Sequence, residues 1–146
     1  MKIAFIFILV GYGTKAGLVP MHTWLPDAHG EAPTPVSAML SANMLTMAIY
    51  AILRFKILTD QAVGPEFTGT LLLGFGFFSV ALSSIFLLLQ EDFKRLLAYS
   101  SIEHIGIALI GFGLGGLGVF GGLWHLLNHA LAKSAAFYGA GLVLLK

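Results

Sequence analysis

The sequence contains no cysteine, and only 10% of its 146 residues carry a formal charge. Without cysteine there is no disulfide framework, no thiolate metal site, no iron–sulfur cluster and no cysteine nucleophile. Eight Lys and Arg against seven Asp and Glu give a net charge of +1, which argues against a protein that binds nucleic acid by neutralising phosphates. We therefore expect no nucleic-acid partner, no cofactor and no redox centre within the chain.

Apolar residues dominate what is present. They make up 58% of the chain, and the mean hydropathy is +0.90. A soluble domain of this size could not hide so much apolar surface, and the 18 glycines are typical of membrane helices. The composition predicts an all-α membrane protein embedded in a lipid bilayer.

About five transmembrane helices are predicted, at residues 3–19, 35–55, 69–89, 96–116 and 119–145. The clearest, 69–89, has no ionisable group over about 20 residues, which is the length that crosses the hydrocarbon core. The second should end near Arg54 and Lys56, whose long side chains can snorkel to the interface. The chain starts almost inside its first helix and ends on its last, so we expect a piece of a longer protein.

The first predicted helix contains Lys15 and is poorly suited to continue past it. Gly13, Gly17 and Pro20 surround the lysine, so the helix is predicted to break there. Broken membrane helices often hold ion sites, because freed backbone groups and a buried charge can share a wet cavity. The alternative is a lysine that snorkels from a helix end.

Three titratable residues follow one face of the last predicted helix. His125, His129 and Lys133 are spaced by four residues, so they form a row about 12 Å long. Each ionisable group inside a bilayer costs about 2.5 to 3.5 kcal/mol on insertion scales, and such groups usually mark proton or ion paths. The row therefore predicts a proton path rather than ordinary interhelical hydrogen bonds.

Three further candidates for a proton pathway are Lys94, Glu103 and His104. Glu103 and His104 are neighbours on the fourth predicted helix and point about 100° apart, so at most one should join a single path easily. Lys94 lies at the membrane boundary in a charged cluster, and a purely orienting role is the alternative for it.

The loop at residues 20–34 contains four potential metal ligands, which are His22, Asp27, His29 and Glu31. Their spacing fits neither a two-histidine helical site nor a zinc finger. We therefore predict no metal site there. We expect the prolines of the loop to fix a re-entrant path instead.

Three stretches of the sequence are similar to one known family. They are GYGTKAGLVPMHTWLPDAHGEAPTPVSAML, EDFKRLLAYSSIEHIG and HLLNHALAKSAAFYGAG. They resemble the antiporter-like proton-conducting subunits of respiratory complex I, Mrp antiporters and membrane-bound hydrogenases. Within this family, DAHGEAPTPVSAML and YSSIEHIG look most similar to component F of hydrogenase-4 and formate-hydrogenlyase-type complexes.

The resemblance implies an inverted-repeat fold and specific residue roles. Lys15 falls on the proton-holding lysine of a broken helix, and Lys94 on the lysine of the connection between half-channels. His125, His129 and Lys133 fall on the central HxxxHxxxK axis. The chain departs from many relatives at Ser41–Asn43, where a His or Lys is usual, so any connection there must use hydroxyl, amide or water. Residues 1–146 are thus expected to form part of a proton-conducting transporter domain.

The leading hypothesis is a proton-translocating subunit in the inner (cytoplasmic) cell membrane. It would belong to a group 4 hydrogenase, formate-hydrogenlyase-type or NADH-quinone oxidoreductase-like complex. Its partners would be other membrane subunits and, through them, hydrogenase and iron–sulfur subunits that transfer the electrons.

Three alternatives remain open. The chain could serve an Mrp-type sodium/proton antiporter. It could carry haem b between His104 and His125 or His129. It could also be a non-conducting truncated scaffold.

Overall fold

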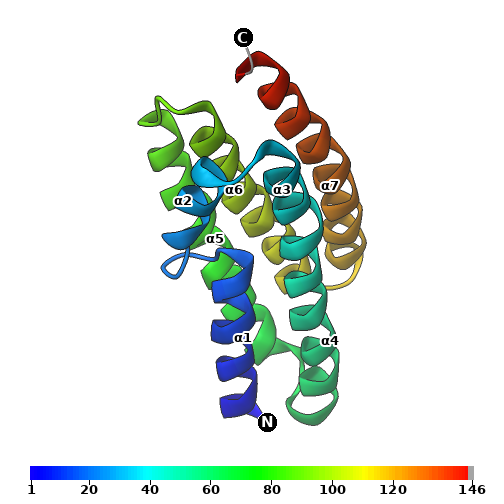
Figure 1. Ribbon diagram of the computed structural model, residues 1–146. Helices are drawn as coiled ribbons and strands as arrows, with labels where there is room; N and C mark the ends of the chain where they lie inside the picture. Colours follow the sequence, from blue (N-terminus) through cyan, green and yellow to red (C-terminus); the bar gives the residue numbers. More distant parts are fainter. Residues whose placement is uncertain (145–146) are drawn as a thin grey trace.

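The computed structural model describes residues 1–144, which fold almost entirely into helices (Figure 1). These are α1 (Lys2–Ala16), α2 (Trp24–Glu31), α3 (Thr34–Met39), the π-helix η1 (Leu40–Met44), α4 (Leu45–Val63), α5 (Pro65–Leu88), α6 (Phe93–Leu114) and α7 (Leu117–Leu144). No strand occurs in this range, and the segments 34–63, 65–88 and 93–114 are long and apolar enough to cross a membrane. The predicted all-α membrane fold is confirmed.

The helix bounds differ from the expected ones mainly after residue 55. The second long helix continues to Val63, and only Gly64 separates it from α5, so the loop expected at residues 56–68 is absent. Lys56 does not snorkel to an interface. It is 6% exposed and forms an ion pair with Asp60 one turn later, which lets the helix continue. For α7, the expected end at Leu145 lies outside the described residues.

The predicted break near Lys15 is present. Helix α1 ends at Ala16, and Gly17 adopts the left-handed conformation with φ of 73°, which glycine tolerates best. The chain then passes through a cis Val19–Pro20 bond and forms α2 within the segment expected to be a loop.

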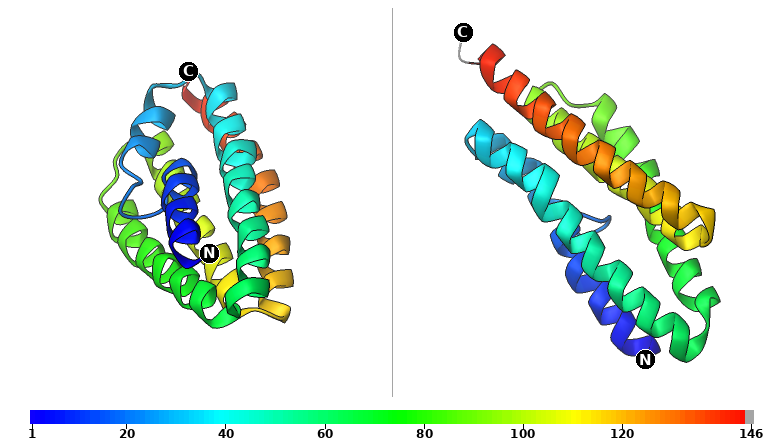
Figure 2. Two further views of the ribbon diagram at one scale, coloured as in Figure 1. Left: turned by 90° about the horizontal axis from the view of Figure 1, so that it is seen from below. Right: turned by 90° about the vertical axis from the view of Figure 1, so that its right-hand side faces the viewer.

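The helices form a bundle with two sides. In Figure 2, α1 and α4 lie together on one side, and α6 and α7 lie together on the other. Helix α5 packs along α6, α2 also contacts α6, and α3 contacts α7. The α5–α6 turn and the end of α7 lie at one end of the bundle, whereas the N-terminus and the α4–α5 turn lie at the other (Figure 1).

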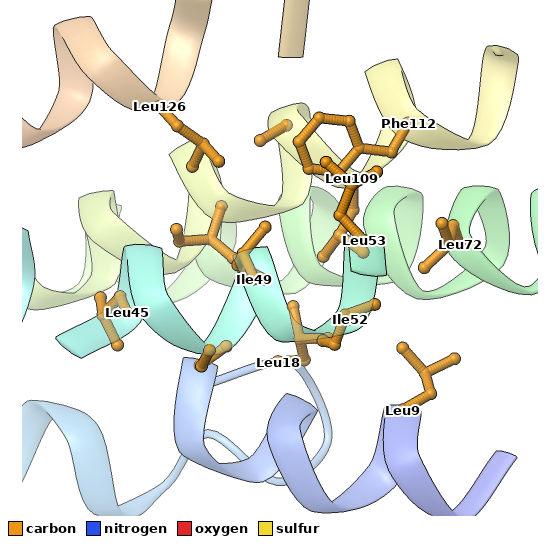
Figure 3. Close-up of a cluster of buried hydrophobic side chains, with 14 of the residues drawn as sticks. Leu9, Leu18, Leu45, Ile49, Ile52, Leu53, Leu72, Leu109, Phe112 and Leu126 are labelled. Atoms are coloured by element: carbon orange, nitrogen blue, oxygen red, sulfur yellow. The ribbon is translucent and has the colours of Figure 1, made fainter. Parts of the chain in front are cut away.

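An apolar core lies between the two sides (Figure 3). Leu9 of α1, Ile49 and Ile52 of α4, and Phe112 of α6 are at most 1% exposed and belong to one cluster. Burial of side chains of this size stabilises the packing by about 1.5–3 kcal/mol each relative to exposure in water. The polar residues described below therefore lie within a bundle whose helices are already fixed by apolar contacts.

Glycines bring α5 and α6 unusually close together. A Cβ atom added at Gly106 would lie 2.9 Å from the carbonyl oxygen of Gly76, and one at Gly113 would lie 2.9 Å from that of Gly69. Only glycine permits such an approach, as at the small-residue interfaces of other membrane helices. The two helices are thus in backbone contact at two levels.

Candidate functional site

Three histidines meet between α6 and α7. The Nδ1 atom of His104 is 3.1 Å from the Nε2 atom of His125, and the His104 ring centroid is 5.3 Å from that of His129. His104 therefore faces the row predicted on α7, whereas its neighbour Glu103 turns to α5 and accepts a hydrogen bond of 3.1 Å from Ser84. The two residues point apart, as the helix period requires.

Lys133 extends this group by one turn of α7. Its side chain is 5% exposed, and its Nζ atom donates to the Leu97 carbonyl at 3.0 Å and to the Ser100 hydroxyl at 2.5 Å. No carboxylate forms an ion pair with it among residues 1–144. We refer to His104, His125, His129 and Lys133 as the histidine–lysine cluster.

The π-helix η1 lies against this cluster. It contacts α7, and the backbone of Ser41 lies beside the His129 ring. Ser41 is fully buried, and its hydroxyl is 2.9 Å from that of Ser101 on α6. A π-helical turn widens the helix locally and is frequent at functional sites. The Ser41 hydroxyl, bonded to Ser101, thus lies in the segment Ser41–Asn43, where the resemblance leads us to expect a His or Lys in many relatives.

Lys15 lies apart from the histidine–lysine cluster. Its side chain is exposed and lines a cavity of about 860 Å³ between α1 and the α3–α4 segment. Asn43 of the π-helix and Arg54 of α4 line the same cavity. Among the described residues, no hydrogen bond or ion pair joins Lys15 to the cluster. The π-helix therefore separates the two, with Asn43 on the cavity and Ser41 near the cluster.

Lys94 lies at the end of the bundle that holds the α5–α6 turn. It is half-buried, and its Nζ atom donates to the Ala32 carbonyl at 3.1 Å. It also lines a cavity of about 580 Å³ with residues of the α2–α3 turn and of α7. Lys94 lies one turn before Leu97, whose carbonyl accepts from Lys133, so both lysines are close to the same part of α6.

Sequence reasoning missed His29. It was expected in a loop, but α2 places it in the interior with no exposed surface, and its ring stacks on Phe137 of α7 at a centroid distance of 4.9 Å. Burial and the nearby ammonium of Lys133 lower the pKa of His29 to about 4. No signal in the sequence alone relates position 29 to this part of α7, because the stack on Phe137 depends on how α2 folds back.

Sequence reasoning also missed the serines on α6. Ser100 precedes His104 by four residues, so the helical period already puts the Lys133 acceptor and the histidine on one face. That spacing was the signal that could have identified Ser100. Lys56 is a further missed buried charge, but it pairs with Asp60 at the other end of the bundle.

Of the three histidines, only His104 and His125 are in hydrogen-bonding contact, since neither ring nitrogen of His129 has a partner among residues 1–144. His104 and His125 are in direct hydrogen-bonding contact, which leaves no room for a porphyrin ring between them. Within the described part of the chain, no three His, Asp or Glu side chains are grouped to hold a metal ion. A neutral imidazole has one donor and one acceptor, so contacting rings can pass a proton along a row.

Comparisons with known proteins agree over nearly the whole length. A family profile described as NADH:quinone oxidoreductase/Mrp antiporter, transmembrane, matches residues 1–146. The chain is 52% identical over 144 residues to a hydrogenase-4 component F homolog of Methylacidiphilum infernorum, covering 98% of this chain and 30% of that protein. It is 39% identical over 153 residues to hydrogenase-4 component B of Escherichia coli, covering 96% of this chain and 23% of that protein.

Solved structures share the same arrangement of helices. A chain of the archaeal membrane-bound sulfane sulfur reductase superposes with a TM-score of 0.90 at 33% identity, covering 97% of this chain and 29% of that one. A chain of the Mrp complex from Dietzia sp. superposes with a TM-score of 0.86 at 27% identity, covering 95% of this chain and 26% of that one. The sequence thus spans less than a third of each of these relatives.

Proposed function

Because the chain belongs to the NADH:quinone oxidoreductase/Mrp antiporter family of membrane proteins, we propose that it forms the central part of a proton-translocating subunit. The observation that carries this proposal is the burial of Lys133 beside three mutually close histidines in the middle of an apolar bundle. A charge placed there is costly, and it is retained where it serves transport.

The complex that we propose is of the group 4 hydrogenase or formate-hydrogenlyase type. Relatives named as hydrogenase-4 components and as formate hydrogenlyase subunit 3 support this assignment. Partner subunits would carry out electron transfer on their own iron–sulfur and hydrogenase centres, and the membrane would be the inner cell membrane. In this arrangement residues 1–146 supply proton-conducting side chains and no redox centre.

Each polar residue has a proposed part in the path. Lys15 stores a proton in the cavity beside α1, and the histidine–lysine cluster relays protons between α6 and α7. Lys94 connects the cluster to the end of the bundle near the α5–α6 turn. Glu103 adjusts the charge of the cluster from the α5 side, where Ser84 holds its carboxylate.

The step between Lys15 and the cluster crosses the π-helix. Asn43 lines the Lys15 cavity, and Ser41 bonds to Ser101 near the cluster. Neither side chain titrates near neutral pH, so both can only orient water or exchange hydrogen-bond partners. We therefore propose that water bridges this step and that the Ser41 hydroxyl keeps it ordered.

The test uses the complete membrane complex that contains this chain. Lys15→Ala and Lys133→Ala are each expected to leave redox turnover measurable while proton pumping per electron falls about a hundredfold, because a relay group is lost. Pumping is followed by quenching of a pH-sensitive dye in vesicles. Lys2→Ala is the matched control, since Lys2 is an exposed lysine at the far end of α1. Undiminished pumping in both variants would refute the mechanism.

A second candidate is a subunit of an Mrp-type sodium/proton antiporter, which the similarity to the Dietzia Mrp structure supports. In that case the same side chains would exchange protons for sodium without redox partners. Vesicles that hold the complex distinguish the two candidates. Acidification driven by a sodium gradient in the absence of electron donors favours the antiporter, and acidification that requires electron transfer favours the first proposal.

A further inference from the structure

His29 is a fully buried imidazole without a hydrogen-bond partner. Its side chain is 0% exposed, and neither ring nitrogen has a hydrogen-bond partner among residues 1–144. An unsatisfied buried polar group costs about 1–3 kcal/mol, so an unpaired imidazole in an interior position calls for a physical explanation. Simple packing would be served better by Phe or Leu at this place.

The surroundings of His29 relate it to Lys133. Its ring stacks on Phe137, which lies one helical turn after Lys133 on α7, and the ammonium of Lys133 acts electrostatically on the imidazole. That ammonium has three hydrogens, of which the Leu97 carbonyl and the Ser100 hydroxyl accept two. One N–H of Lys133 therefore remains for a further acceptor.

The helix that carries His29 ends close to a cavity at one end of the bundle. Three residues after His29, the Ala32 carbonyl accepts from Lys94, and the cavity of about 580 Å³ begins at Pro33. Tyr138, the neighbour of Phe137, lines the same cavity from α7. His29 therefore stacks on the neighbour of a residue that lines the cavity, and α2, which carries it, ends just before the cavity at Pro33.

We infer that His29 is a further proton-relay residue, which exchanges protons between Lys133 and the cavity beside Lys94. This inference rests on the proposed function. In the transfer, an N–H bond of the Lys133 ammonium breaks and an N–H bond forms at the free ring nitrogen of His29, directly or through one water molecule. The products are a neutral amine and an imidazolium, and no electron moves. The second ring nitrogen then releases its proton toward the cavity.

The charges around His29 make this step conditional. Burial and the positive charge of Lys133 both lower the pKa of His29, so the imidazole is neutral while Lys133 is charged. Once Lys133 gives up its proton, one of these two causes disappears. At rest the pair therefore carries one positive charge, which lies on Lys133. An additional positive charge on the neighbouring histidines would drive the transferable proton toward the cavity.

The experiment compares His29→Phe and His29→Ala in the complete complex. His29→Phe keeps the aromatic stack on Phe137 but cannot hold a proton, so pumping per electron should fall about a hundredfold with the complex assembled. Phe137→Leu is the matched control: it removes the stack, keeps the imidazole, and should pump within about twofold of the native complex on the same reasoning. Unchanged pumping in His29→Phe would overturn the inference.

Chemical rescue separates proton relay from packing. His29→Ala leaves a space the size of an imidazole, and added 4-methylimidazole should restore pumping, whereas the equally large but much less basic 4-methylpyrazole should not. Equal rescue by both compounds, or by neither, would assign His29 a packing role and overturn the inference.

The two proposals can fail separately. If Lys15→Ala and Lys133→Ala both pump normally, the proposed function fails whatever His29 does. If they do not pump but His29→Phe does, only the role of His29 is refuted. Should His29→Ala fail to assemble, His29→Phe carries the test, because it retains the contact with Phe137.

Discussion

Replacing Lys133 by Met should separate stability from transport. Met has a side chain of similar length without charge, so it can fill the same space between α6 and α7. The substitution removes two hydrogen bonds from the ammonium, to the Leu97 carbonyl and to the Ser100 hydroxyl. Hydrogen bonds to charged groups contribute about 1.5–3 kcal/mol each, so this loss is about 3–6 kcal/mol.

Two effects offset that loss. The Leu97 carbonyl still accepts from the Ser101 hydroxyl at 2.9 Å, so it is not left unsatisfied. A buried ammonium also carries a desolvation penalty of several kcal/mol, which Met avoids. The net change in the free energy of unfolding should therefore lie within about 2 kcal/mol of zero, even though transport is lost.

The assay measures both properties in one preparation. Thermal unfolding of the purified complex is followed by tryptophan fluorescence, and proton pumping is measured in vesicles from the same sample. Ser134→Ala is the control, because Ser134 follows Lys133 directly and its hydroxyl donates to the Ala130 carbonyl of its own helix. A destabilisation of more than about 4 kcal/mol that accompanies the loss of pumping would refute the reasoning, because it would make Lys133 a structural residue.

Two further predictions concern the frame of the bundle. Asp60→Asn should destabilise the protein by about 3 kcal/mol, because it leaves the buried charge of Lys56 without its partner; adding Lys56→Met should recover most of that loss, as thermal unfolding of the single and double variants would reveal. Gly106→Ala should cost about 1–3 kcal/mol, since its methyl group would lie 2.9 Å from the Gly76 carbonyl oxygen; an unchanged melting temperature would contradict the described contact.

The fold was largely predictable because hydropathy and helix length dominate in a membrane. The long apolar segments, the break after Lys15 and the row on α7 all follow from local spacing. The end of the second helix was predicted wrongly for a physical reason. Lysine is a residue type that often marks the end of a membrane helix at the interface. Asp60, however, neutralises the charge of Lys56 from within the same helix.

The site was predictable only where its residues share one helix. His125, His129 and Lys133 follow from the period of four, but their relation to His104 depends on how α6 and α7 pack. His29 could not be assigned, because it stacks on Phe137 of α7 only when α2 folds against the bundle. Its sequence neighbours, Ala28 and Gly30, give no indication of a polar interior.

The glycine contacts between α5 and α6 bear on which parts of the bundle can move. With backbones touching at Gly69–Gly113 and at Gly76–Gly106, neither helix can slide or rotate against the other without steric overlap. The two helices must therefore move together as one rigid hairpin, and any rearrangement of the bundle has to occur at its borders with α2, α4, the π-helix and α7. The histidine–lysine cluster lies at the border with α7, so displacement of the hairpin would act directly on the spacing of these side chains.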